Sequence, residues 1–392
     1  MRIFVVGMPG AGNLGDDLIS VMLVRHILER WPGAEVGVLY GGYSNPLSYS
    51  DPAQICWLPS PRRRSWQEYI GRLRTISRFA RTSDLILIGG GGLFQDSHYR
   101  FTVHKWMRTA LDTSLQGQPV AAVGVGVGPF NHPFSLWYLK QGLARLSAIQ
   151  VRDEESATIV RSLGYCAEVA PDIVAGTNLL GTSFGVQVDK PSTPVLGCSI
   201  RPWPGLNFTA IVNLIGMVCR SIGSSVRFFV FEYAEPHNTS EYDYAVQIAQ
   251  SLQERGITVE VFCYRKQPIN DFVQAFNSVT MAIAARFHAN ILWQKLGIPV
   301  LPVSYAPKVA RLYEDRGGHV ISVNRIDTIN ALSLFQTIEV SETYSLPSNA
   351  KLFRDVRFNS RYLYALGHMV GIMETGYGLS RSVAWRIKRL VS

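Results

Sequence analysis

The chain has 392 residues, of which 47% are hydrophobic and 17% are charged. These proportions exclude a disordered or fibrous chain and predict two domains of ordinary size, each with its own core. The formal net charge of +9 favours anionic partners such as phosphates, acidic sugars, nucleic acids or anionic lipids.

The first half of the chain alternates short apolar runs with helix-like segments. Several of the runs are apolar throughout, as in parallel strands that are buried on both faces. The predicted strands are Ile3–Gly7, Glu35–Tyr40, Leu85–Gly89, Val120–Val127 and Ala148–Arg152. This alternation predicts a doubly wound, Rossmann-like α/β domain over residues 1–175.

The same alternation returns in the second half. Residues 176–194 are rich in Gly, Thr, Ser and Pro, which predicts a linker. A second Rossmann-like domain is expected over residues 195–340, and a helical segment over 341–392. The predicted strands are Val195–Ser199, Arg227–Phe231, Ile257–Cys263, Met281–Ala284 and Pro299–Val303. We therefore expect two α/β domains that face a cleft, where the carboxyl ends of their strands would bind ligands.

Cysteine usage and hydropathy predict a cytoplasmic protein. The five cysteines are widely spaced and form no C-x-x-C pair, as is typical of free thiols in a reducing compartment. The chain begins directly with a strand-like run, and no run of about 18 apolar residues occurs, so we expect neither a signal peptide nor a membrane-spanning helix. The eight histidines are scattered away from metal-ligand spacing, and no metal is expected.

Glycine clusters follow three of the predicted strands. Gly10–Gly15 reads GAGNLG, a literal G-x-G-x-x-G, but the second strand ends at Tyr40-Gly41-Gly42 without the acid that a dinucleotide site requires. Gly89–Gly92 and Gly124–Gly128 complete the set. Such clusters predict a close backbone approach to a ligand or to the other domain, with backbone N–H groups that could bind an anion, although a tight structural turn explains GAGNLG equally well.

Short motifs occur in a fixed order over roughly residues 10–310. They are Gly12-Asn13-Leu14-Gly15-Asp16, Gly89 to Asp96, Gly124 to Pro129, Val151-Arg152-Asp153 with Ser156, Pro171-Asp172, Arg286-Phe287-His288-Ala289, Gly297 to Val300 and Ser304 to Lys308. In this order they resemble the polysaccharide pyruvyl transferase family. Phe287 stands where that family usually has Leu, and Ala306 where many members have an acid.

The resemblance implies a GT-B-type fold and a specific reaction. A pyruvyl group would pass from phosphoenolpyruvate (PEP) to two hydroxyls of one sugar and form a cyclic ketal. The acceptor would be an exopolysaccharide, a cell-wall glycan or a lipid-linked precursor, and no cofactor is expected beyond PEP as the donor. The resemblance also implies that the C-terminal domain binds PEP and the N-terminal domain the acceptor.

PEP carries a phosphate and a carboxylate, and the planar guanidinium of arginine suits both groups. Arg286 and Arg201 both follow predicted strands of the second domain and are the candidate PEP ligands, with an ion pair at the domain surface as their alternative role. His288 is the candidate general acid or base, because histidine titrates in the required range, and a phosphate ligand is its alternative role. Lys308 could contact the phosphate or be a solvated surface lysine.

The acceptor side is assigned to loops of the first domain. Its candidate residues are Asn13, Asp16, Gly91, Gly92, Asp96, Arg152, Asp153 and Asp172. A carboxylate there could take a proton from a sugar hydroxyl or hydrogen-bond it. Asp16 and Asp153 have the alternative role of helix caps.

Two basic segments are compatible with peripheral binding to a membrane. Residues 62–81 combine seven arginines with aromatic and aliphatic residues at helical spacing, and residues 381–389 are similar. Each segment predicts either an amphipathic helix packed on its own domain or peripheral contact with the inner face of the membrane. No nucleic-acid-binding motif occurs.

Two other functions remain as alternatives. A GT-B glycosyltransferase would hold the ribose of a sugar nucleotide through a carboxylate such as Glu232 or Glu235, but it does not explain the R-x-H element. A non-catalytic glycan-binding relative would not need to keep Arg286 and His288.

Overall fold

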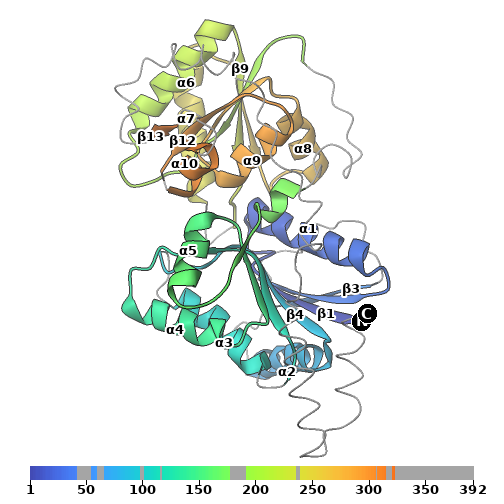
Figure 1. Cartoon of the computed structure of the whole chain (residues 1–392). Coiled ribbons are helices and arrows are strands. Elements are labelled where there is room, and N and C mark those ends of the chain that lie inside the picture. Colours follow the sequence, from blue (N-terminus) through green and yellow to red (C-terminus); the bar gives the residue numbers. More distant parts are fainter. Residues whose placement is uncertain are drawn as a thin grey trace, which may run out of the picture. The chain divides into compact units, whose positions relative to one another are not determined.

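The computed structural model describes residues 1–41, 54–59, 66–97, 101–114, 117–176, 191–234, 239–305, 307–314 and 320–322. These residues form two compact units, each built on one parallel sheet (Figure 1). The first unit contains residues 1–10 and 16–176. The second contains residues 11–15 together with 191–322. Residues 177–190 of the predicted linker, the segment 341–392 with its basic tail, and Glu235 lie outside the described residues.

The first unit has a seven-stranded sheet in the order β3-β2-β1-β4-β5-β6-β7. Its strands are β1 (Arg2–Val6), β2 (Glu35–Tyr40), β3 (Ile55–Pro59), β4 (Leu85–Phe94), β5 (Val120–Val127), β6 (Ala148–Val151) and β7 (Glu168–Val169). Its helices are α1 (Leu14–Arg30), α2 (Trp66–Thr82), α3 (Thr102–Ser114), α4 (Pro133–Leu143), α5 (Glu154–Ser162) and the 3-10 helix η1 (Ile173–Gly176). The strand order reverses between β1 and β4, and Figure 1 shows α1 on one face of the sheet and α2 on the other.

The second unit has a six-stranded sheet in the order β10-β9-β8-β11-β12-β13. Its strands are β8 (Val195–Ser199), β9 (Ser225–Val230), β10 (Val259–Cys263), β11 (Met281–Ala284), β12 (Val300–Ser304) and β13 (Ile321–Ser322). Its helices are α6 (Phe208–Ile222), α7 (Ser240–Gln253), α8 (Ile269–Asn277), α9 (Phe287–Lys295) and α10 (Pro307–Glu314). Here the order reverses between β8 and β11.

Both cores follow from the apolar runs of the sequence. All eight residues of β5 are buried, because helices cover both faces of a parallel sheet. In the second unit, an aromatic cluster packs β9 against α8 and α9. The rings of Phe276 and Trp293 are stacked in it, with 4.4 Å between their centroids. Burial of such large rings contributes strongly to the stability of this unit.

The predicted α/β fold with two doubly wound sheets is confirmed. The ten predicted strands are all present: four have the predicted limits at both ends, and five have ends that shift by one or two residues. The exception is β4, which continues through its glycines to Phe94 because Gly91 and Phe94 still pair with Val125 and Val127 of β5. Three strands, β3, β7 and β13, were not predicted.

No helix in the described part of the chain is long and apolar enough to cross a bilayer.

Candidate functional site

The carboxyl ends of four strands bring charged and aromatic side chains together in the second unit. Arg201 follows β8, Glu232 follows β9, Arg286 follows β11 and Tyr305 follows β12. The strands β9, β8, β11 and β12 are neighbours in the sheet, so their ends lie side by side. This edge includes the point where the strand order reverses, which is where doubly wound sheets bind their ligands.

Arg286 is the most enclosed of these residues. It is buried at the N-cap of α9, where its Nη2 donates to Glu232 Oε2 at 2.6 Å and to the carboxylate of Glu241. Burial lowers the pKa of Arg286, and so does the charge of Arg201, whereas Glu232 raises it. The two carboxylates offset the cost of burying this guanidinium.

Those two carboxylates differ in character. Glu241, in the first turn of α7, has a side chain only 3% exposed, and its other oxygen accepts a hydrogen bond from the Phe231 backbone N–H at 3.0 Å. The side chain of Glu232 is 25% exposed, and its Oε2 lies 4.0 Å from Arg201 Nη1 as well as next to Arg286. Glu241 is therefore a fixed counterion, whereas Glu232 can exchange with solvent or with a ligand.

The two arginines retain unused donors. Arg201 Nε and Arg286 Nε are both buried without a hydrogen-bond acceptor among the described residues. Buried donors of this kind are uncommon and suggest a missing acceptor. An anion with several oxygens would satisfy them.

An aromatic wall adjoins the cations. The rings of Trp203 and Tyr305 lie 4.6 Å apart, and the guanidinium carbon of Arg201 lies 5.6 Å from each. Burial alone would raise the pKa of the Tyr305 phenol, but the charges of Lys308, Arg286 and Arg201 and a hydrogen bond from Arg201 outweigh it and lower that pKa. The cations thus create a local field that favours negative charge.

His288 is the second residue of α9, and its ring lies against Gly15. A Cβ built on Gly15 would lie 2.0 Å from His288 Nδ1, so a larger residue here would force the imidazole to move. The Gly15 backbone N–H donates to Asn13 Oδ1 at 2.9 Å, which fixes the turn. Gly15 of the G-N-x-G-D motif and His288 of the R-x-H element, from distant parts of the chain, therefore meet in the second unit.

The glycine loop is docked on the segment that carries Glu232. Leu14 N–H donates to Phe231 O, and Tyr233 N–H donates to Gly12 O, both at 2.9 Å. Gly12 has a φ of +90°, and a Cβ there would lie 2.6 Å from Tyr233 O. Close packing thus accounts for both glycines in the loop that leads to His288.

Hydrogen bonds from buried side chains fix the β11–α9 turn that carries Arg286 and His288. Buried Asn290 donates through Nδ2 to the backbone oxygens of Ala284 and Arg286, at 3.2 and 2.7 Å. The Tyr313 hydroxyl donates to Asn290 Oδ1 at 2.7 Å. This chain of hydrogen bonds fixes the direction in which α9 begins.

In the first unit, a smaller cluster forms around Arg152. Its Nη1 lies 3.5 Å from Asp172 Oδ2, and its Nε lies 3.7 Å from Asp153 Oδ2. A Cβ on Gly126 would lie 2.8 Å from the same Nε, so the glycine strand end gives this guanidinium its room. Arg152, Asp153 and Asp172 are thus brought together as a group.

Several of the other predicted acceptor residues have evident structural contacts. Asp153 caps α5 by accepting from Ser156 N–H at 2.8 Å, as its alternative role predicts. Asp96 accepts from the backbone N–H groups of Asn131 and His132 and from the Ser135 hydroxyl, at 2.6 to 3.0 Å, and so fixes the start of α4.

The remaining residues of the first-unit loops lie near α1. Asp16 stands in the first turn of α1, and a Cβ on Gly91 would lie 3.6 Å from its Oδ1. A Cβ on Gly92 would lie 2.5 Å from the Gln95 side chain. Gly90, which precedes Gly91, leaves room for Ile19, because a Cβ there would come within 1.9 Å of its side chain. Packing thus explains part of this glycine cluster.

Three residues of the second-unit edge were not predicted: Glu241, Trp203 and Tyr305. Tyr305 lies within the S-Y-x-P-K motif, so the sequence carried a signal for it. Trp203 stands two residues after Arg201 but has no motif. In the sequence, Glu241 cannot be distinguished from other acids in the first turn of a helix. Only the fold shows that it is buried against Arg286.

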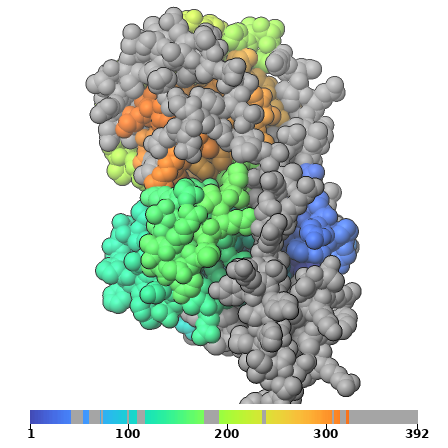
Figure 2. All heavy atoms as spheres, viewed as in Figure 1, coloured from blue at the N-terminus to red at the C-terminus, as the bar shows by residue number. Residues whose placement is uncertain are grey.

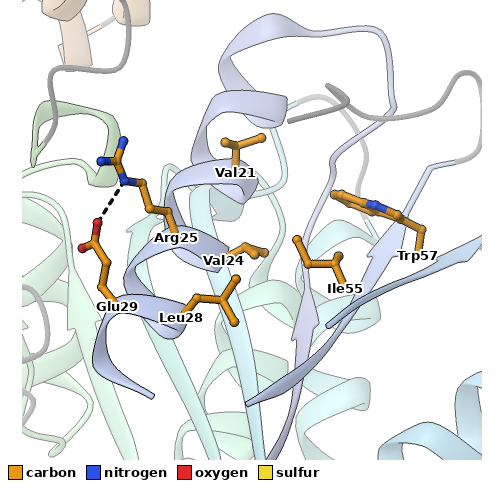
Figure 3. A pocket seen from close by; sticks show the side chains of 7 residues that line it. All are labelled: Val21, Val24, Arg25, Leu28, Glu29, Ile55 and Trp57. Carbon is orange, nitrogen blue, oxygen red and sulfur yellow. Dashed lines mark hydrogen bonds and ion pairs between the residues drawn. The ribbon is translucent and has the colours of Figure 1, made fainter. Parts of the chain in front are cut away.

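One surface hollow lies away from these residues. Figure 3 shows it between α1 and β3 of the first unit, and its lining is largely apolar. The lining residues are Val21, Val24, Arg25, Leu28, Glu29, Ile55 and Trp57. The only charges, Arg25 and Glu29, pair with each other at 2.9 Å, so the hollow offers nothing for an anionic substrate. Across the described ranges, no three His, Cys, Asp or Glu side chains are grouped to hold a metal ion.

Two doubly wound α/β units define a GT-B-type fold, and solved structures agree. A UDP-GlcNAc 2-epimerase from Neisseria meningitidis bound to UDP-GlcNAc is similar with a TM-score of 0.56 and 15% identity, over 87% of this chain and 92% of that one. The UDP-GlcNAc 2-epimerase of Methanocaldococcus jannaschii gives 0.56 and 13%, over 94% and 100%. S. aureus MnaA, in a co-structure with UDP, gives 0.59 and 12%, over 93% and 97%.

A family model identifies the chain more specifically than the fold does. The chain belongs to the polysaccharide pyruvyl transferase family, whose model matches residues 13–307. This match spans the glycine loop, the Arg152 group and the cationic edge of the second unit, and it confirms the resemblance drawn from the motifs. No curated protein sequence matches the chain.

Proposed function

We propose that this chain transfers a pyruvyl group from PEP to two hydroxyls of one sugar in an exopolysaccharide, a cell-wall glycan or a lipid-linked precursor, forming a cyclic ketal. The observation that carries the proposal is the cationic edge of the second unit. There, Arg201 and Arg286 keep buried, unused N–H donors beside the N-terminus of α9. Family membership supports the transfer chemistry.

PEP has two anionic groups, and this edge offers matching cations. The forks of Arg201 and Arg286 suit a carboxylate or a phosphate, and Glu232 would give up its place next to Arg286 when the ligand arrives. The first N–H groups of α9 add partial positive charge. Lys308, 5.9 Å from the centre of the Tyr305 ring, supplies a further cation.

The reaction needs a proton at the methylene carbon of PEP. We assign this donation to His288, at the start of α9. Protonation makes the central carbon electrophilic, and one sugar oxygen forms a bond to it. The bond from that carbon to the phosphate oxygen then breaks, and a second sugar oxygen takes its place. The two sugar hydroxyls lose two protons. One replaces the proton that His288 gave to the methylene carbon, and the other leaves with inorganic phosphate.

Recognition of the acceptor is assigned to the first unit. Arg152 and Asp172, paired at 3.5 Å, offer a donor and an acceptor to sugar hydroxyls at the carboxyl edge of that sheet. Asp16, in the first turn of α1, and Gly91–Gly92 complete the proposed acceptor set of the first unit. Asn13, which the sequence analysis grouped with them, belongs to the second unit. Asp96 and Asp153 would act indirectly, through the helix starts that they hold.

Acceptor-dependent release of phosphate from PEP tests the proposal. A screen of bacterial glycans and lipid-linked saccharides should yield one that releases phosphate and gains a ketal detectable by NMR. Arg201→Gln should lower kcat/KM for PEP by about 10- to 100-fold, because a charged hydrogen-bonding group is lost.

Arg227→Gln is the matched control. Arg227 lies in the same unit with the same 23% side-chain exposure, and it is ion-paired to Glu260 at 2.7 Å near the amino end of β9. The control should keep full activity. Consumption of a sugar nucleotide, without release of phosphate from PEP by any acceptor, would instead support the glycosyltransferase alternative.

A further inference from the structure

Exposed apolar side chains gather on one helix of the first unit. Phe134 is 74% exposed and Trp137 is 55% exposed, and Leu136 lies between them on α4. Phe101, just before α3, is also exposed. Together they make up four of the six exposed large hydrophobic residues in the described part of the chain. Figure 2 shows the region of α4, in teal, open on the surface of this unit.

The helix α4, which carries these exposed side chains, is firmly packed on its unit. The buried face of α4 consists of Ser135, Leu139, Gly142 and Leu143. Phe134 and Trp137, almost one turn apart, point away from this face. Asp96 anchors the first turn through the backbone of residues 131 and 132 and through Ser135. Gly142 packs so closely on α3 that a Cβ would lie 2.1 Å from Met107 Sδ.

The exposed charged residues that the structure describes on α3, on α4 and just after α4 are all positive, and the nearby carboxylate of Asp96 is buried. Lys140 and Arg145 are exposed on α4 and just after it, and Lys105 and Arg108 are exposed on the adjoining helix α3. Between residues 97 and 151 the chain contains five Lys or Arg residues and one acid, Asp112. A protein partner usually offers mixed charges, whereas a bilayer with anionic lipids offers a continuous negative surface above an apolar layer.

We propose that the α4 surface, defined by Phe134, Trp137, Lys140 and Arg145, binds peripherally to an anionic lipid bilayer. Phe and Trp rings lie favourably at the boundary between headgroups and acyl chains. Lys and Arg side chains next to them contribute further attraction to anionic headgroups. This surface is distinct from the basic segments 62–81 and 381–389, and the proposal does not depend on pyruvyl transfer.

Co-sedimentation of the full chain with vesicles tests this proposal. Wild-type protein should bind vesicles of phosphatidylglycerol and phosphatidylcholine, bind pure phosphatidylcholine far less, and lose affinity at high salt. The double variant Phe134→Ser/Trp137→Ser should bind about tenfold more weakly, and so should Lys140→Glu/Arg145→Glu. Both changes are on exposed side chains, and unchanged thermal midpoints would show that the variants fold.

Val169→Ser is the matched control, because Val169 is an exposed apolar residue of β7 in the same unit. It should bind vesicles as the wild type does. Failure of the wild type to bind anionic vesicles would overturn the proposal. Undiminished binding by both double variants would also overturn it and assign the contact to the basic segments. Self-association lost in Phe134→Ser/Trp137→Ser, without vesicle binding, would show that a second copy covers the surface.

Discussion

At the scale of single residues, the central feature is a buried arginine with two unequal counterions. Glu241 is enclosed and hydrogen-bonded to the backbone, whereas Glu232 is partly exposed and shared with Arg201. Glu241 therefore keeps Arg286 in place when no ligand is bound, and a ligand can replace Glu232. An incoming carboxylate or phosphate could therefore bind without opening the core.

Glu241→Gln tests the fixed half of this arrangement. Glutamine can still accept from the Phe231 N–H, but it removes the charge that offsets buried Arg286. We expect the free energy of unfolding to fall by about 3 kcal/mol, measured by urea denaturation. Glu260→Gln is the control. It removes a half-exposed carboxylate paired with Arg227, and it should cost less than about 1 kcal/mol. Equal effects of the two changes would contradict the role given to Glu241.

Gly15→Ala tests the contact between the glycine loop and His288. The added Cβ would lie 2.0 Å from Nδ1, so the imidazole must move. If His288 donates the proton, kcat should fall by about 100-fold, since a shift of about 1 Å has that effect on a positioned catalytic group. Gly33→Ala, where a Cβ meets nothing within 4 Å, should keep the wild-type kcat. A folded Gly15→Ala protein with unchanged kcat would remove His288 from the chemistry.

At the scale of helices and strands, the sequence was most informative where a run is apolar throughout. The strands β2, β5, β8 and β11 match their predicted limits at both ends, and the last three are buried along their whole length. The strand β3 was missed because Ile55–Pro59 lies at the sheet edge and has only one fully buried residue, so its pattern is weak. β7 and β13 have two residues each, too few to give any period.

The candidate site was predictable only in part, for a similar reason. Motifs identified Arg286, His288 and the glycine loop, but they could not show that Gly15 lies against His288. Chain order carries no information on which strand ends are neighbours until the sheet order is known. Asp96 illustrates the converse: it stands in a family motif, yet all three of its hydrogen bonds hold the start of α4.

Asp96→Asn tests that helix start and its pH dependence. Burial would raise the pKa of Asp96, but hydrogen bonds from Ser135, Asn131 and His132 outweigh it and lower the pKa. A lowered folded-state pKa gives stability that is present above the unfolded value of about 3.9 and lost as the pH falls through the folded value. The variant should be about 2 kcal/mol less stable at pH 7, with a smaller difference at pH 3. A difference that is constant with pH would contradict a charged Asp96.

At the scale of the whole molecule, two sheets of similar design carry different side chains at their carboxyl edges. The second unit gathers arginines, a histidine and an aromatic pair, which suit an anionic donor. The first unit gathers Arg152 with Asp172, which suits hydroxyl groups. The similarity to UDP-GlcNAc 2-epimerases shows the fold, and the family model places the chain among the polysaccharide pyruvyl transferases.

The proposed function depends on PEP binding to the second unit, and thermal stability with added ligands measures that binding. A ligand that binds only the folded state adds about 2.7 kcal/mol of stability at a hundred times its Kd, so the midpoint must rise. We predict a rise with PEP that is smaller in Arg201→Gln and unchanged in Arg227→Gln, with no rise from UDP-GlcNAc, other UDP- and GDP-sugars or NAD. A rise with a sugar nucleotide, and none with PEP even when acceptor glycans are present, would contradict the account.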